Sequence, residues 1–324
     1  MEISIQASYT LDLLCFIDLL ISDFSSDFDG DVAHFRNFLS YEGEANLAFL
    51  KKTFGRELSL QQLIAPLLVA DKEFGKLSMS ELLVSGRYLV NAYKQSVAND
   101  RASVWYQRFL QGEASQLIAA LEPVVADMER AGFKHYWLMN HLPAMNKTIE
   151  DFRKRFDWEQ LSHRLKAFTS GTQHIYLCGL AQLDFNNLGG GHFLATSDTP
   201  ARRLARTLIE EAVHLAVAPL DSGQLLGALP RSEDALPVKL SRDYLQTCVS
   251  LALEYMLKEQ LGFIQNAELH LLNVEKGQYE LAVYLYRYLL DAPKTTDKLG
   301  DYLEAWLRQL DVSQLAHAKV MKIA

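Results

Sequence analysis

The spacing of hydrophobic residues predicts helices along most of this chain. In one segment after another, apolar residues recur every three or four positions, which is the period of an amphipathic helix. Glycines such as Gly75, Gly112 and Gly132 stand where several of these patterns stop, as expected for residues that end helices. In the first half, the predicted helices cover residues 32–38, 44–54, 60–70, 80–95, 102–110, 114–131, 134–140, 147–156 and 158–168. In the second half, they cover residues 199–218, 242–261, 268–273, 279–290, 298–310 and 313–321.

A strand-like pattern interrupts the helices first at the start of the chain. Ile3, Ile5 and Ala7 alternate with polar residues, and this period of two predicts a short strand. Thr10 follows directly before an apolar run, so it is expected to cap a helix that continues to Leu20.

The second interruption begins after Ser170 and predicts the rest of a small sheet. Residues 174–179 are rich in β-forming side chains, a polar turn is expected around 184–187, and a glycine-rich segment leads into a strand over 189–196. The chain is therefore expected to be mainly α with a small β-sheet, an α+β fold. Three regions are predicted: a helical N-terminal region, 1–169, a core that holds the sheet, 170–262, and a helical C-terminal region, 263–324.

One predicted helix carries polar groups within an apolar stretch. Between Thr207 and Val217 the acidic and imidazole side chains are Glu210, Glu211 and His214. A helix that is apolar on most faces is usually buried, and an unpaired buried carboxylate is costly. These three groups are therefore expected to line a cleft, to bind a ligand or to pair with one another.

Composition and charge argue against two classes of binding partner, nucleic acids and membranes. The chain has 324 residues, of which 49% are hydrophobic and 22% charged, as in ordinary globular proteins. The net charge of −8 comes from acidic residues spread along the chain, which argues against a nucleic-acid partner. No apolar run is long enough for a membrane span, so no membrane partner is expected either.

The cysteines favour a reducing compartment. Cys15, Cys178 and Cys248 are isolated in apolar segments, and the sequence holds no C-x-x-C pair. This pattern argues against a disulfide framework and against a thiolate zinc site. A reduced, cytoplasmic protein is the resulting prediction.

The polar helix resembles a known metal motif. Glu210-Glu211-x-x-His214 is similar to the His-Glu-x-x-His helix of zincin metallopeptidases of the gluzincin kind, with the first histidine replaced by Glu210. The resemblance extends in its order of elements over about residues 137–261 and implies a zincin-like core. It implies that Glu210 and His214 are metal ligands and that Glu211 is the catalytic base that activates water.

A third ligand would come from the next long helix. In gluzincins a downstream glutamate completes the metal site, and the matching stretch here is 250–255. In one register Ser250 takes this position and the ligand is lost; in the other, one turn further on, Glu254 takes it. The alternative for Glu254 is an ion pair with Lys258, four residues later on the same helix.

The resemblance also implies a cofactor and a substrate-binding edge. A site with two carboxylate ligands would hold zinc or manganese, and the alternative is that no metal is bound. Gly190, Gly191 and His192 would belong to an edge strand that pairs with extended substrate. The predicted partner is a peptide or a protein.

Three functions follow from these observations. The first is a metallopeptidase-like protein with an altered metal site, weak or inactive as a peptidase. The second is a pseudo-enzyme that keeps the cleft without metal or chemistry. The third is a helical peptide-binding or partner-binding protein in which Glu210 and His214 form a structural pair.

Overall fold

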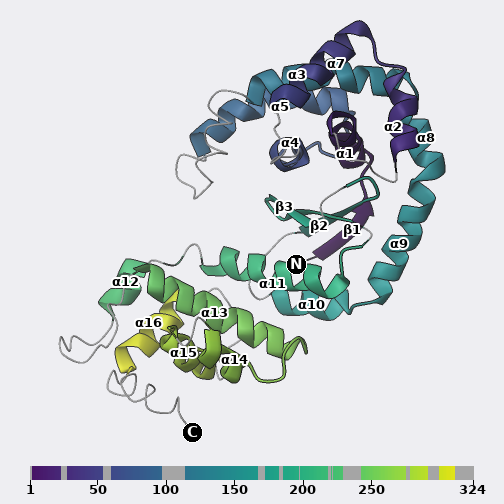
Figure 1. The fold of residues 1–324 in the computed structure, drawn as a ribbon. Coiled ribbons are helices and arrows are strands. Elements are labelled where there is room, and N and C mark those ends of the chain that lie inside the picture. The colour runs from purple at the N-terminus through teal and green to yellow at the C-terminus, as the bar shows by residue number, and fades with distance from the viewer. Residues whose placement is uncertain are drawn as a thin grey trace. The chain divides into compact units, whose positions relative to one another are not determined.

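The chain forms two compact units (Figure 1). The N-terminal unit comprises Ile3–Arg155 and Gln173–Thr199, and the C-terminal unit comprises Met1–Glu2, Phe156–Thr172 and Pro200–Ala324. In this computed structural model helices predominate and one small sheet is present, which confirms the predicted fold class. The structure describes residues 2–22, 28–53, 60–96, 114–166, 172–181, 185–196, 198–217, 220, 222–228, 242–274, 278–290 and 299–310.

The sheet has four strands in the order β1-β2-β4-β3. β2 and β4 run parallel, with His174 opposite His192, and β3 runs antiparallel to β4. The reversal between β3 and β4 falls on three glycines, Gly189, Gly190 and Gly191, whose φ angles of 82°, 59° and 82° favour residues without a side chain. The strands are β1 (Glu2–Ala7), β2 (Thr172–Cys178), β3 (Phe185–Gly189) and β4 (His192–Thr196).

Two expectations about the sheet are wrong. Residues 185–187 are part of strand β3 and not of a polar turn, because the glycines after them provide the reversal. The glycine-rich strand is not an edge strand, because β4 pairs with β2 on one side and with β3 on the other. An extended substrate therefore finds no free edge along β4.

Helix α1 (Tyr9–Ile21) lies in the core of the N-terminal unit, with every residue from Thr10 to Leu20 buried. Ser8 and not Thr10 caps it, since the Ser8 side chain accepts a hydrogen bond from the backbone N–H of Leu11 at 3.3 Å. α1 packs against α4 (Leu60–Val69), which is also largely buried. Burying these two helices removes their apolar side chains from water, which favours folding of this unit.

A carboxylate on α1 caps the start of α4. Asp18 accepts hydrogen bonds from the backbone N–H groups of Leu60, at 2.6 Å, and Gln61, at 3.1 Å. These are N–H groups of the first helical turn, which have no partner within their own helix. Burial raises the pKa of Asp18 to about 7 in spite of these two bonds, which act in the opposite direction.

The other helices of the N-terminal unit surround this core. α7 packs on α3 and α5, and α8 packs on α9. The predicted helix over 102–110 lies outside the described residues. The bounds are α2 (Asp29–Arg36), α3 (Tyr41–Thr53), α5 (Met79–Ser96), α7 (Ala114–Arg130), α8 (Phe133–Asn140) and α9 (Leu142–Lys154).

The C-terminal unit is built around one long helix, α13 (Arg242–Gln260). α13 packs against α11, α12, α14 and α15, so elements on both sides of residue 262 belong to one unit. The short helix α12 follows α11 in the sequence, and the predicted helix over 313–321 lies outside the described residues. The remaining bounds are α10 (Trp158–Leu165), α11 (Ala201–Val217), α12 (Ser222–Gly227), α14 (Ala267–Asn273), α15 (Glu280–Leu290) and α16 (Leu299–Gln309).

Replacing the buried cap should destabilise the N-terminal unit strongly. Asp18→Ala leaves two buried backbone N–H groups without an acceptor, which we expect to lower the free energy of unfolding by about 2–4 kcal/mol. Ser8→Ala removes one longer hydrogen bond at a helix start and should lower it by about 1 kcal/mol. Urea denaturation followed by circular dichroism measures both losses; equal losses in the two variants would contradict the role given to Asp18.

Candidate functional site

Helix α11 carries the three polar residues of the predicted motif on an amphipathic surface. Glu210 and His214 are exposed and Glu211 is half-buried. The expectation that this helix is buried on most faces is therefore wrong, because one stripe of it faces solvent along its whole length. The side chains that face the interior are Ala201, Leu204, Ala205, Leu208, Ile209, Ala212, Val213 and Val217.

A lysine of helix α13 links two of the predicted metal ligands. The Lys258 ammonium donates a hydrogen bond to Glu210 Oε1 at 3.1 Å and another to Glu254 Oε1. The Lys258 side chain is only 13% exposed, against 47% for Glu210, so most of its surroundings are protein. Burial lowers the pKa of Lys258, but the carboxylates of Glu254 and Glu210 outweigh this effect and hold the pKa above its usual value. The ammonium is therefore charged at neutral pH.

Glu254 is linked to Glu210 through this lysine, because both carboxylates contact the same ammonium. Whether Ser250 or Glu254 takes the third-ligand position stays a prediction. The ion pair between Glu254 and Lys258, which was the alternative to ligation, is present. Two of the three predicted ligands thus lie together, with a cation of the chain between them.

His214 does not complete a compact ligand set. In the described part of the chain, one set of three metal-ligating side chains has its ligand atoms within 4.8 Å of one another, and this set lies elsewhere. Glu210, His214 and Glu254 are all described residues and do not form such a set. Their roles as metal ligands, and that of Glu211 as catalytic base, stay predictions.

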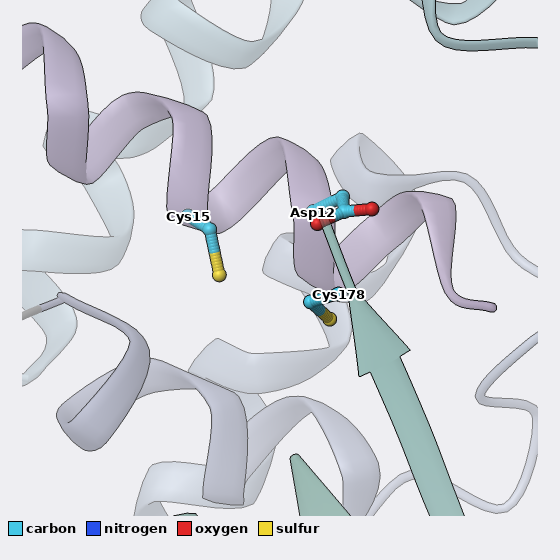
Figure 2. Close-up of side chains that lie close together, drawn as sticks. All are labelled: Asp12, Cys15 and Cys178. Atoms are coloured by element: carbon cyan, nitrogen blue, oxygen red, sulfur yellow. The ribbon is translucent and has the colours of Figure 1, made fainter. Parts of the chain in front are cut away.

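The compact set lies in the core of the N-terminal unit and consists of Asp12, Cys15 and Cys178 (Figure 2). Asp12 and Cys15 are three residues apart on α1 and so share one face of that helix. Cys178 is the last residue of β2. All three side chains are buried, with exposed fractions of 0%, 1% and 0%.

The polar atoms of this cluster have defined partners. Asp12 accepts hydrogen bonds from the indole N–H of Trp137, at 2.8 Å, and from the backbone N–H of Leu180, at 3.0 Å. The Cys15 thiol donates to Gln61 Oε1 at 3.0 Å. The carboxylate is therefore held by neutral donors on both of its oxygen atoms.

Burial changes the acidity of each group in the cluster. It raises the pKa of Asp12 to about 6, although the hydrogen bonds from Leu180 and Trp137 act in the opposite direction. It also raises the pKa values of the Cys15 and Cys178 thiols above their usual range. Both cysteines are therefore neutral thiols at pH 7 in this state.

Two cysteines that are isolated in the sequence lie together in this cluster. Cys15 and Cys178 are far apart in the sequence, and no C-x-x-C pair marks them. They meet because α1 packs beside the end of β2, which local spacing does not reveal. The spacing of Asp12 and Cys15 on one helical face was the single sequence signal, and it is a weak one.

The residues predicted to bind substrate lie at the turn of the β3–β4 hairpin. Gly190 and Gly191 form the turn, and His192 begins β4. The His192 ring stacks on the ring of His174, with centroids 4.8 Å apart, and its Nδ1 lies 2.9 Å from the hydroxyl oxygen of Tyr176. Their role in substrate binding stays a prediction, now without the edge strand that it assumed.

The electrostatics of His192 favour a neutral ring. Burial, followed by the charge of His174, lowers the pKa of His192 from 6.5 to about 4. In the tautomer with its proton on Nε2, the neutral ring accepts a hydrogen bond from the Tyr176 hydroxyl at Nδ1.

Protonation of His192 should weaken the fold in acid. Below pH 6.5 the unfolded chain takes up a proton at this histidine, while the folded protein does so only near pH 4. The contribution of this histidine to the free energy of unfolding is therefore highest above pH 6.5, where the ring is neutral in both states. It falls by about 1–3 kcal/mol as the pH decreases from 6.5 to about 4.

The variant His192→Phe isolates this contribution. Its stability should fall less than that of the parent between pH 6.5 and pH 4, whatever its stability at neutral pH. Asp12 and Asp18 are present in both proteins and cancel in the comparison. Urea denaturation at several pH values measures the difference, and identical pH profiles would refute the effect.

No protein-family model, curated protein or solved structure matches this chain. Among the helices of the described residues, none has the length and apolar character needed to cross a membrane. Function is therefore inferred from the contacts within each unit.

Proposed function

We propose that the chain is a non-catalytic, metallopeptidase-like binding protein in which Lys258 takes the place of the metal ion. The observation that carries this proposal is the contact of one ammonium with both Glu210 and Glu254. In a metal-dependent enzyme, two carboxylates brought together in this way would share a divalent cation. Here the Lys258 ammonium supplies the positive charge that the two carboxylates would otherwise take from a metal ion.

The lysine opposes metal binding at this place. A divalent ion that approached Glu210 and Glu254 would meet a positive charge already within hydrogen-bonding distance of both carboxylates. The ion would have to displace Lys258, whose side chain is mostly covered by protein. Moving the ammonium away would break two charge-assisted hydrogen bonds, which are among the stronger ones in proteins.

Without a metal the motif has no route to hydrolysis. A zinc peptidase uses three protein ligands and one open position, where the ion acidifies a water molecule. Glu211 would then act on that water as a base. With Lys258 in place of the ion, no metal-bound water forms and Glu211 has no activated nucleophile to serve.

The exposed carboxylate suggests the chemistry of the partner. Glu210 is 47% exposed, and the single charge of Lys258 is shared with Glu254, so one negative charge of the pair is not balanced within it. Glu211 adds a further half-buried carboxylate on the same helix. This surface suits a peptide or protein segment that presents a lysine or arginine side chain.

The metal-dependent hydrolase is the second candidate, and one observation favours it. Glu210 and Glu254 come from different helices and converge on one cation, as ligands of a metal site would. If Lys258 swings away, the pair could accept manganese or zinc with His214 nearby on α11. The two candidates differ in whether metal addition produces cleavage.

A peptide library distinguishes the candidates directly. The parent should bind basic peptides without cleaving them, and added zinc, manganese or cobalt should produce no cleavage, because Lys258 keeps the metal out. Glu210→Gln should weaken peptide binding several-fold, since it removes the exposed charge. Cleavage that depends on added metal and disappears in Glu211→Gln would favour the hydrolase instead.

Removing the lysine should open the site to a hard cation. We expect Lys258→Met to bind manganese at least ten times more tightly than the parent, because both carboxylates lose their internal cation. Manganese titration followed by electron paramagnetic resonance of the free ion measures this change. Lys76→Met is the matched control, since Lys76 pairs with Glu73 on an exposed surface. An equally weak affinity in Lys258→Met and the control would mean that Lys258 does not replace a metal.

A further inference from the structure

The buried cluster of the N-terminal unit gathers donors from three separate elements. Asp12 and Cys15 come from α1, Cys178 from β2, and Gln61 from α4. The ligand atoms of Asp12, Cys15 and Cys178 lie within 4.8 Å of one another, and Gln61 Oε1 is 3.0 Å from Cys15 Sγ. Gln61 is only 1% exposed. Four potential metal donors thus meet in the interior of one unit (Figure 2 labels three of them).

We propose that Asp12, Cys15 and Cys178 are ligands of a structural zinc-class ion, with Gln61 Oε1 as the fourth donor. This site is distinct from the Glu210–Lys258–Glu254 contact, which lies in the other unit. It takes a divalent cation of borderline softness that accepts tetrahedral geometry.

The dimensions of the cluster fit such an ion. Zinc lies about 2.3 Å from a thiolate sulfur and about 2.0 Å from a carboxylate oxygen, so tetrahedral sulfur ligands are about 3.8 Å apart. The observed limit of 4.8 Å leaves only a small contraction to reach these values. Rotation about the Cα–Cβ bonds of Cys15 and Cys178 would supply it while Asp12 keeps its two hydrogen bonds.

The surroundings hold the oxygen donors in place. The Trp137 indole and the Leu180 backbone N–H fix both oxygens of Asp12 and leave further lone pairs for an ion. The backbone of Gln61 is fixed by its hydrogen bond to Asp18. Hydrogen bonds of this kind to metal ligands are what orient the ligands in metalloproteins.

The charge balance of binding is favourable for a divalent ion. Two sulfur–metal bonds form as two S–H bonds break, and the two protons leave to solvent. Two positive charges leave with the protons and two arrive with the ion, so the net charge of the buried cluster does not change. Binding therefore adds no uncompensated charge to the buried cluster.

The donor set excludes other occupants of the cluster. Magnesium, calcium and manganese prefer oxygen ligands, whereas two of the four donors here are sulfur. A disulfide between Cys15 and Cys178 would need a two-electron oxidant such as a peroxide, and it would remove the hydrogen bond from the Cys15 thiol to Gln61. A metal ion would use all four side chains as donors.

The site would be closed and structural. All four donors are protein side chains, so no coordination position is left for substrate or water. Since the cluster is buried, the ion would be taken up as the unit folds, and it would tie α1, α4 and β2 together.

Elemental analysis of the full chain, expressed with added zinc and purified under reducing conditions without chelator, tests the proposal. We expect about one zinc ion per chain in the parent, as for other closed structural sites. Cys15→Ala and Cys178→Ala should lose at least nine-tenths of it. Cys248→Ala is the matched control, because Cys248 is also buried and free but lies in the other unit, and it should keep the zinc.

A second measurement uses the parent protein alone, so it does not require that the cysteine variants fold. The parent expressed with cobalt in place of zinc should show the near-ultraviolet absorption of cobalt–thiolate bonds, and refolding with cobalt should release two protons per ion. Absence of both metals from the parent, zinc retained in Cys15→Ala and Cys178→Ala, or a Cys15–Cys178 disulfide found by mass spectrometry in protein kept reduced would overturn the proposal.

Discussion

The N-terminal unit depends on how a fully buried helix satisfies its two carboxylates. α1 is buried from Thr10 to Leu20, yet it carries Asp12 and Asp18 in its interior. A buried carboxylate without hydrogen-bond donors would destabilise the fold by several kcal/mol, so other elements must bring donors to it. Trp137 and the backbone of Leu180 serve Asp12, and the first turn of α4 serves Asp18. These few contacts fix where α4, α8 and the end of β2 lie around α1.

The C-terminal unit solves a similar problem at its surface. The apolar residues of α11 pack against the unit, and Glu210 and His214 face solvent, where water stabilises charged groups. The partly buried carboxylate of Glu254 is matched by Lys258 on its own helix, and this lysine also reaches Glu210. These two groups of carboxylates are thus stabilised differently: Asp12 and Asp18 by neutral donors in the interior, Glu210 and Glu254 by an ammonium near the surface.

This difference bears on the metal chemistry that each of the two sites allows. A carboxylate held by neutral N–H groups can still share its free lone pairs with a cation, as proposed for Asp12 beside two thiols. A carboxylate pair that already holds an ammonium has much less attraction left for a second cation. Both proposals therefore place the metal in the cluster without a recognisable motif, and not in the motif that resembles a zinc peptidase.

The sequence by itself determined most of the helices, the small sheet and the mainly α class. Periodic apolar positions locate elements such as α13 and α15 within a few residues, because helix formation follows local spacing. The sequence also placed Glu210, Glu211 and His214 on one helix and offered the pair of Glu254 with Lys258, since both depend only on the period of a helix. The local pattern gave wrong predictions where strand pairing determines the structure. Phe185–Gly189 is a strand because β4 pairs with it, and β4 is an interior strand because β2 pairs with its other edge.

Only the tertiary structure decided which distant side chains meet. Lys258 contacts Glu210 because α13 packs on α11, and Cys178 lies beside Asp12 and Cys15 because β2 ends next to α1. The residues of each contact are far apart in the sequence, so no helical or strand period predicts that they meet. Such contacts arise from the packing of whole elements against a shared core, and that packing is set by the sum of many apolar contacts rather than by the few polar residues that it brings together.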